Sequence, residues 1–338
     1  MSDKPADNLK HPYQALTPDV ILDSIESLGM VTDGRFLALN SYENRVYQVG
    51  IEAEQPLIVK FYRPNRWTDQ AILEEHEYTL GLAALEIPVV APEVFSDELL
   101  PSGRTLHYWQ GFRFAIYARH GGRWPELSNM DNLRWMGRFI GRIHAVGAVA
   151  QFSNRPTISV DEFGQDAYEY LMQSQFIPLE LEKAYESVVK HILQQIKALY
   201  PLESAKFIRL HGDCHPGNIL WTDSGPHFVD FDDARMGPAI QDLWMLLSGD
   251  REDMTRQIAA ILEGYSEFAT FDPIELNLIE SLRSLRMINY SAWLARRWDD
   301  PAFPQNFPWF DSNRYWEDHI LALKEQLSAL QEQPISWS

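Results

Sequence analysis

The chain reads Lys206-Phe-Ile-Arg-Leu-His-Gly-Asp-Cys-His-Pro-Gly-Asn-Ile-Leu-Trp221 and then His227-Phe-Val-Asp-Phe-Asp-Asp-Ala234, and this stretch decides its fold. Short apolar runs inside it predict strands, because each is too brief for a helix and is bounded by Gly, Pro or Asp. Polar side chains stand where these runs end. His211, Asp213 and Asn218 share one loop, and Asp230 follows the last run, twelve residues beyond the asparagine.

These residue types in this order suit phosphoryl transfer from ATP. In that reaction the protein does little covalent chemistry. It positions the acceptor hydroxyl and supplies cations that offset the negative charge of the phosphates. Asp213 fits the carboxylate beside the attacking hydroxyl, while Asn218 and Asp230 offer the hard oxygen ligands that Mg²⁺ prefers. A loop that returns on itself brings the three to one cleft, and we expect His211 to support it by hydrogen-bonding backbone.

Two other interpretations of the loop compete with this one. Asp, Asn and Gly are ordinary hairpin residues, but four polar residues at this spacing between strands argue against a hairpin alone. Zinc is the second alternative, because His211, Asp213, Cys214 and His215 lie close together. A loop with Gly and Pro does not supply the ligand geometry of a helix, so Cys214 is interpreted as a small packing residue.

The quoted stretch resembles the aminoglycoside phosphotransferase and choline kinase family, which has the protein-kinase-like fold. Further segments resemble a bacterial serine/threonine protein kinase of that family, among them Leu39-Asn-Ser-Tyr-Glu-Asn-Arg-Val-Tyr-Gln48, Val59-Lys-Phe-Tyr-Arg-Pro64 and Gly237-Pro-Ala-Ile-Gln-Asp-Leu-Trp244. The resemblance runs from about residue 39 to residue 309. It implies an α+β, bilobal fold, with a small β-rich N-terminal lobe and a larger α-helical C-terminal lobe.

Lys60 interrupts the apolar strand predicted over 57–62. A buried lysine is costly unless it is paired, so this position asks for an anionic partner. The resemblance implies that Lys60 holds the ATP phosphates and that Glu75, on the helix predicted over 68–85, pairs with it. Glu74 is the second candidate, because a single sequence does not fix the phase of the helix.

The remaining nucleotide contacts rest on the resemblance. The chain has no glycine-rich phosphate loop, but the turn Asn40–Asn44 joins two predicted strands ahead of Lys60. Backbone N–H groups in such a turn can bind an anion, and Ser41 is expected to approach the phosphates. Tyr117 and Ala118 are expected to present backbone hydrogen bonds to the adenine, and Asp242 is expected to brace the catalytic loop.

The pattern of the chain divides near Gly121-Gly122. Strand-like segments dominate before this point, whereas long helical periods dominate after it, with 206–233 as the exception. The sequence thus predicts an N-terminal nucleotide-binding lobe over residues 1–118 and a C-terminal helical lobe, which carries catalysis and the substrate, over residues 119–338.

The composition limits partners and location. The formal charge is −19 and the pI is near 4.9, which disfavours sequence-independent binding to nucleic acid or to anionic membranes. The single cysteine cannot form an internal disulfide, so we expect a reducing, cytoplasmic compartment. No run approaches the length of a membrane span. We expect a monomer with ATP and Mg²⁺ as its nucleotide and metal.

The acceptor is the part of the reaction that the sequence describes least. Following the resemblance, the first hypothesis is a serine/threonine protein kinase. The second is a kinase of a small alcohol such as choline, homoserine or an aminoglycoside, and the third is an inactive nucleotide-binding scaffold. Aromatic residues between 290 and 316 are interpreted as core rather than as a substrate rim. A set of acids predicts a negative acceptor side that suits a cationic acceptor or a basic peptide: Asp232, Asp233, Asp299, Asp300 and Asp311.

Overall fold

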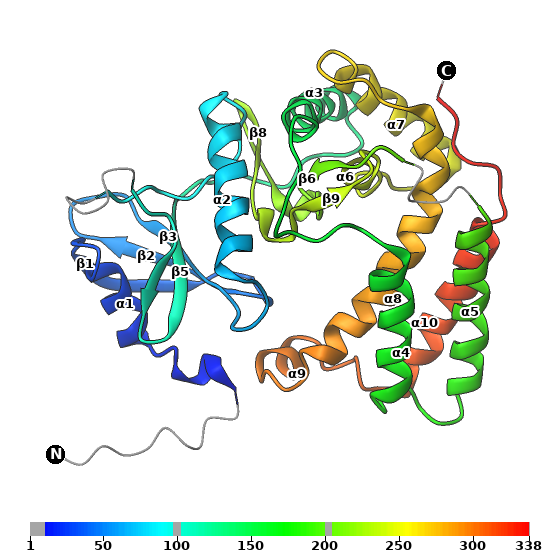
Figure 1. The fold of residues 1–338 in the computed structure, drawn as a ribbon, viewed down its shortest axis with the longest axis horizontal. Coiled ribbons are helices and arrows are strands. Elements are labelled where there is room, and N and C mark those ends of the chain that lie inside the picture. The colour runs from blue at the N-terminus through cyan, green and yellow to red at the C-terminus, as the bar shows by residue number, and fades with distance from the viewer. Residues whose placement is uncertain (1–10, 97–102, 200–204, 338) are drawn as a thin grey trace.

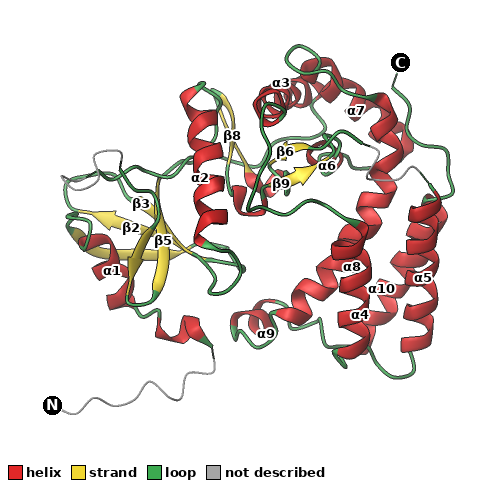
Figure 2. Ribbon diagram, in the orientation of Figure 1, coloured by secondary structure: helices red, strands yellow, loops and turns green. Residues whose placement is uncertain are grey.

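The structure, a computed structural model, describes residues 11–96, 103–199 and 205–337. Figure 1 shows two lobes, and Figure 2 shows that the larger sheet lies in one of them while helices dominate the other. The α+β, bilobal prediction is confirmed.

A five-stranded antiparallel sheet forms the N-terminal lobe, with strand order β1-β2-β3-β5-β4. Lys60 lies on β3, the central strand, paired in register with Val46 on one side and Ala115 on the other. The sheet therefore fixes the lysine at its centre. The strands are β1 Thr32–Ala38, β2 Arg45–Ile51, β3 Leu57–Phe61, β4 His107–Trp109 and β5 Phe112–Ala118.

Helix α1, Pro18–Glu26, covers this sheet. Thr17 caps the helix by accepting a hydrogen bond from the Val20 N–H, and Pro18 occupies the first turn, where its missing N–H costs nothing. The apolar face of α1, including Ile21 and Ile25, belongs to one buried cluster with the strands. Burial of such side chains is the main force that holds helix and sheet together.

Helix α2, Asp69–Ala84, packs against both lobes. Ile72, near its start, packs with N-terminal residues, whereas Leu82, near its end, belongs to the core of the C-terminal lobe. The Tyr78 hydroxyl lies 3.2 Å from the carbonyl oxygens of Ile143 and Arg209. In Figure 1, α2 stands between the sheet and the C-terminal lobe.

Among the described residues, the C-terminal lobe consists of helices and two short strand pairs. The strand pairs are antiparallel: β6 Ile208–Leu210 with β9 Arg235–Gly237, and β7 Ile219–Thr222 with β8 Gly225–Phe228, of which only β7–β8 is a hairpin. The α-helices are α3 Met130–Gly147, α4 Asp166–Gln173, α5 Glu182–Ala198, α6 Gln241–Trp244, α7 Arg251–Tyr265, α8 Ile279–Arg296, α9 Ala302–Asn306 and α10 Asn313–Ala329. Single turns of other helix types lie at Pro12–Ala15, Asp161–Gln165, Pro216–Asn218, Phe231–Asp233 and Pro273–Leu278.

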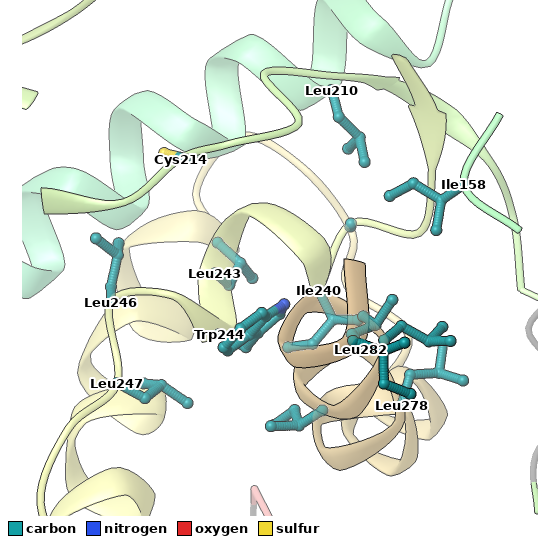
Figure 3. Close-up of a cluster of buried hydrophobic side chains, with 14 of the residues drawn as sticks. Ile158, Leu210, Cys214, Ile240, Leu243, Trp244, Leu246, Leu247, Leu278 and Leu282 are labelled. Carbon is teal, nitrogen blue, oxygen red and sulfur yellow. The ribbon is translucent and has the colours of Figure 1, made fainter. Parts of the chain in front are cut away.

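The core of this lobe lies directly behind the 206–233 motif. Figure 3 shows Cys214 and Leu210 in a cluster with Leu243, Trp244 and Leu246 from the α6 region. Cys214 is buried, and burial raises the pKa of its thiol well above the ordinary value. The thiol is thus a packing group, as the sequence predicts.

The strand predicted over 57–62 and the helix predicted over 68–85 are observed as β3 and α2. The apolar segment Val89–Phe95 forms only isolated bridges, from Val89, Pro92 and Phe95, and no strand. Pro92, inside this segment, has no backbone N–H and so removes a donor that a strand requires. Within the residues described, no helix is both long and apolar enough to cross a membrane.

Candidate active site

The motif loop brings Asp213, Asn218 and Asp230 together through backbone geometry. The β7–β8 hairpin pairs Ile219 with Phe228, so the residues just outside that pair face each other. The Val229 N–H accordingly donates to the Asn218 carbonyl at 3.0 Å. The Asn218 side-chain amide donates to the Asp213 carbonyl at 3.0 Å. These contacts tether Asn218 to Asp213 and to Val229, the residue that precedes Asp230.

His211 and Asp242 hold the loop from behind. His211 Nε2 lies 2.9 Å from the Val229 carbonyl oxygen. The Asp242 carboxylate accepts from the backbone N–H groups of His211 and Gly212, at 2.8 and 2.9 Å, and lies 3.0 Å from His144 Nε2. Burial raises the pKa of Asp242, but these hydrogen bonds outweigh it and hold the pKa below its usual range. The bracing role predicted for Asp242 matches these contacts.

One carboxylate oxygen of Asp213 forms an ion pair with an arginine. Arg286 Nη1 lies 2.5 Å from Asp213 Oδ1, while Oδ2 lies 3.5 Å from His215 Nε2. Burial lowers the pKa of His215 more than the nearby Asp213 raises it. His215 is therefore neutral near pH 7, and Arg286 is the permanent positive charge beside this acid.

Asn218 and Asp230 have the chemistry of a site for a hard divalent cation. The nitrogen of the Asn218 amide is used by the Asp213 carbonyl, which leaves its oxygen as the acceptor. The Asp230 side chain is 45% exposed, so one of its oxygens is accessible. Asp230 has a left-handed backbone (φ 59°, ψ 65°), an uncommon conformation that aspartate tolerates better than most residues. An amide oxygen and a carboxylate are the ligands that Mg²⁺ accepts.

Lys60 reaches the same point from the opposite lobe. Its Nζ lies 2.9 Å from Asp230 Oδ1 and 3.3 Å from Asp232 Oδ1, and the lysine side chain is only 6% exposed. Burial lowers the pKa of Lys60, but the two carboxylates outweigh it and leave the pKa well above its ordinary value. A charged lysine thus stands where the nucleotide phosphates are expected.

The predicted pairing of Lys60 with Glu75 is not formed in this structure, because Asp230 and Asp232 take the lysine instead. Glu75 is buried, and none of the described residues hydrogen-bonds to its Oε2. Burial raises the pKa of Glu75 to about 7, in spite of the opposing effect of Lys60. The second candidate, Glu74, is wrong for a different reason: its carboxylate accepts three backbone N–H groups of residues 153–155.

Two arginines that the sequence analysis missed fix the segment after Asp230. Arg66 forms ion pairs with Asp232 and with Asp233, the latter at 2.7 Å. Arg155 donates to the backbone carbonyl groups of Asp232 and of Ala234. Burial raises the pKa of Asp232, but Arg66 and Lys60 lower it to about 2. Arginines on loops carry no sequence signal that points to such partners.

The negative acceptor side predicted from five acids is wrong for three of them. Asp232 is bound by Arg66 and Lys60. Asp233 pairs with Arg66 and with Arg235. Asp300 is buried against arginines of the N-terminal lobe. These charges are neutralised within the protein, and Asp299 and Asp311 are exposed.

The turn between β1 and β2 is clamped to the C-terminal lobe through Glu43. Its carboxylate lies 3.0 Å from Arg297 Nε and accepts from Trp293 Nε1 at 2.5 Å. The Ser41 N–H donates to the Leu39 carbonyl oxygen within the turn at 2.8 Å. Ser41 itself lines a hollow between the turn and α9. As the turn stands, the Ser41 N–H is not available to a phosphate.

Tyr117 and Ala118 end strand β5 where the chain leaves the sheet. They pair in register with Ile58 and Leu57 of β3. Five residues after Ala118, the backbone of Arg123 bridges to Trp221 of the C-terminal lobe. The Tyr117 hydroxyl lies 3.0 Å from that of Tyr62. The predicted adenine contacts therefore lie at the connection between the lobes.

The aromatic tract is largely core, as predicted. Phe303, Phe310 and Trp316 are fully buried in the cluster of the C-terminal lobe. Tyr290 and Trp309 are exceptions, because both are partly exposed, and Tyr290 stacks on Trp293 at 5.7 Å between ring centroids.

The chain is similar in sequence to known kinases and matches a known enzyme family. The sequence pattern of the phosphotransferase enzyme family matches residues 35–276. The chain is 45% identical over 328 residues to stress response kinase A of Escherichia coli K12, covering 97% of this chain and 98% of that protein. It is 43% identical to the serine/threonine protein kinase RdoA of Salmonella typhimurium, covering 96% of each.

Solved structures share the fold at low sequence identity. An amicoumacin kinase in complex with AMP-PNP and Ca²⁺ matches with a TM-score of 0.71 and 16% identity, covering 97% of this chain and 96% of that one. The choline kinase LicA of Streptococcus pneumoniae matches with a TM-score of 0.60 and 17% identity, covering 92% and 98%.

Proposed function

The chain belongs to the phosphotransferase enzyme family, and from that premise we propose that it is a serine/threonine protein kinase that uses Mg²⁺ and ATP. One observation carries the proposal: Asn218 is hydrogen-bonded to Asp213 and to Val229, the residue before Asp230, and Lys60 reaches Asp230 from the other lobe. The relatives named as stress response kinase A and as a serine/threonine kinase support the choice of acceptor.

We assign the metal to Asn218 and Asp230, whose oxygens suit a hard cation. When bound, Mg²⁺ neutralises negative charge on the phosphates as the phosphoryl group moves. Lys60 binds the phosphates, and Ser41 lies in the turn expected to cover them. Once Asp230 turns to the metal, Lys60 needs another anionic partner, and the Oε2 of buried Glu75, to which none of the described residues hydrogen-bonds, is the group available for that role.

Asp213 acts on the acceptor. Its carboxylate accepts the proton of the serine or threonine hydroxyl, and the hydroxyl oxygen bonds to the γ-phosphorus of ATP. The bond from that phosphorus to the bridging oxygen breaks, and ADP leaves with the electron pair. Asp242 and His211 keep the loop in place during the transfer.

The proposal extends to the organisation of the protein. Residues 1–118 form the nucleotide-binding lobe, residues 119–338 form the catalytic and substrate lobe, and Tyr117 and Ala118 contact the adenine at their junction. The enzyme acts as a monomer in the cytoplasm, in keeping with its single cysteine.

A labelling experiment tests this function. The purified protein is incubated with Mg²⁺ and [γ-³²P]ATP, alone and with casein, histone, choline, homoserine or an aminoglycoside. We expect label on phosphoserine or phosphothreonine of a protein acceptor. Turnover confined to one of the small alcohols favours the second candidate, a kinase of a small alcohol. The fold shared with an amicoumacin kinase and a choline kinase is the observation in favour of that candidate. No transfer to any acceptor contradicts both.

A further inference from the structure

One face of helix α8 extends from Asp213 of the motif loop to the β1–β2 turn. Arg286, Tyr290, Trp293 and Arg297 follow one another at helical spacing and so share this face. Arg286 contacts Asp213 at one end of the face, and Arg297 contacts Glu43 of the β1–β2 turn at the other. The face therefore spans the distance from the catalytic acid to the turn expected to cover the phosphates.

Arg286 is not needed to hold α8 in place. Its side chain is 43% exposed, whereas Leu282, Leu285 and Ile288 anchor the helix in the core. Among the described residues, its guanidinium donates a single hydrogen bond, to Asp213. An arginine has five N–H donors in a fixed fork, so most of its hydrogen-bonding capacity is unused beside the catalytic acid.

Within the part of the chain that the structure describes, the other charges near the motif loop are paired with each other, and Arg286 pairs with Asp213 alone. Asp232 pairs with Arg66 and Lys60, and Asp233 pairs with Arg66 and Arg235. Asp300 is buried against Arg45 and Arg63. Asp213 satisfies only one donor of the guanidinium. A second anion can therefore share this arginine without displacing Asp213.

We infer that Arg286 selects acceptors that have an acidic group beside the hydroxyl to be phosphorylated. This inference rests on the proposed function. The fork of Arg286 holds Asp213 with one N–H and offers the others to a carboxylate of the acceptor, since bidentate and charge-assisted contacts are the strong ones. The acceptor hydroxyl is thereby placed next to Asp213 Oδ2, the oxygen that Arg286 leaves free.

The acceptor we assign is a peptide with Ser or Thr next to Asp or Glu. Tyr290, partly exposed and stacked on Trp293, gives such a peptide a flat apolar contact one turn along the helix. This selection is opposite to the basic peptide expected from the sequence, because three of the five acids on which that expectation depends are paired within the protein.

Three peptides test the inference, alike except that the residue next to the acceptor serine is Glu, Gln or Lys. The measured quantity is the ratio of kcat/KM between peptides, which is insensitive to a uniform loss of activity. We expect the wild type to favour Glu over Gln by about tenfold, the size of one net charge-assisted hydrogen bond. Arg286→Gln is expected to abolish this preference, and Arg286→Glu to favour the Lys peptide.

Arg283→Gln is the matched control, because Arg283 lies one turn away on α8 and pairs with Glu280; it should keep the wild-type ratio. Equal kcat/KM for all peptides in the wild type overturns the assignment of Arg286 and leaves the kinase activity standing. An equal rise on all three peptides in Arg286→Gln identifies the arginine as a block on Asp213 and also overturns the inference. Absence of any phosphoryl transfer by the wild type overturns the proposed function together with the inference.

Discussion

Arg63 of the N-terminal lobe and Asp300 of the C-terminal lobe form a buried ion pair, with 2.7 Å between Nη2 and Oδ2. The Asp300 side chain is 1% exposed, and Arg45 contacts it as well at 2.7 Å. Arg63 also pairs with Glu43, at 2.9 Å. The two lobes are thus joined by charges at the β1–β2 turn, in addition to the chain connection after Ala118.

Asp300→Asn is expected to destabilise the protein, because two buried guanidinium groups lose their shared partner. Breaking a buried pair by removing one member costs about 3–5 kcal/mol; since Glu43 still pairs with Arg63, we expect a loss of about 3 kcal/mol in the free energy of unfolding. Urea unfolding followed by tryptophan fluorescence measures it. Asp318→Asn, which removes an exposed pair on α10, serves as the control and should change the value by less than about 0.5 kcal/mol. Equal effects of the two variants would show that Asp300 does not join the lobes.

Lys60→Met is expected to lower phosphoryl transfer about a hundredfold, the usual effect of removing one group that stabilises developing charge. Lys60 also neutralises Asp230 and Asp232, so its loss leaves those acids facing the phosphates. The measurement is kcat/KM for ATP. Lys190→Met removes an exposed lysine of α5 and should leave kcat/KM unchanged. Wild-type turnover by Lys60→Met would contradict the assignment of the lysine to the phosphates.

Glu75 makes stability depend on pH. Burial raises its pKa from 4.5 to about 7, so the folded state keeps a proton that the unfolded chain has already lost in this window. The contribution of Glu75 to the free energy of unfolding is therefore complete below about pH 4.5 and falls as the pH rises to 7 and above. Glu75→Gln removes the carboxylate and this dependence.

The free energy of unfolding of Glu75→Gln, minus that of the wild type, should increase between pH 5 and pH 8 by on the order of 3 kcal/mol. Unfolding free energies at the two pH values measure it. Glu77→Gln, at an exposed position on the same helix, should show no such growth. A difference in unfolding free energy that is the same at both pH values would mean that Glu75 is ionised throughout the range.

The sequence is sufficient to predict the groups that lie on one continuous stretch. Asp213, Asn218 and Asp230 follow strands that a single hairpin brings together, so spacing along the chain translates into spacing in the fold. Lys60 is also predictable, because a lysine inside an apolar strand requires an anion. Which anion it contacts is not, since Asp230 and Glu75 come from different elements and the relative placement of the lobes decides between them.

The contacts that join distant elements could not be predicted from the sequence. Arg286 stands 73 residues after Asp213, on a helix with other arginines. In the sequence it is indistinguishable from a solvated arginine such as Arg314, and only the packing of α8 brings it to the loop. Asp300 shows the same limit, because its position next to exposed Asp299 suggests a solvated charge, whereas in the structure it is buried.

Transfer of the γ-phosphoryl group by Asp213→Asn, measured together with nucleotide binding, tests the central claim most directly. Asp223→Asn, in the turn between β7 and β8, is the control and should retain full activity. For Asp213→Asn we expect transfer to a serine acceptor to fall about a thousandfold, as for the loss of a general base, while the affinity for Mg²⁺-ATP is kept. Transfer at the wild-type rate by Asp213→Asn would contradict the role of this carboxylate at the acceptor hydroxyl.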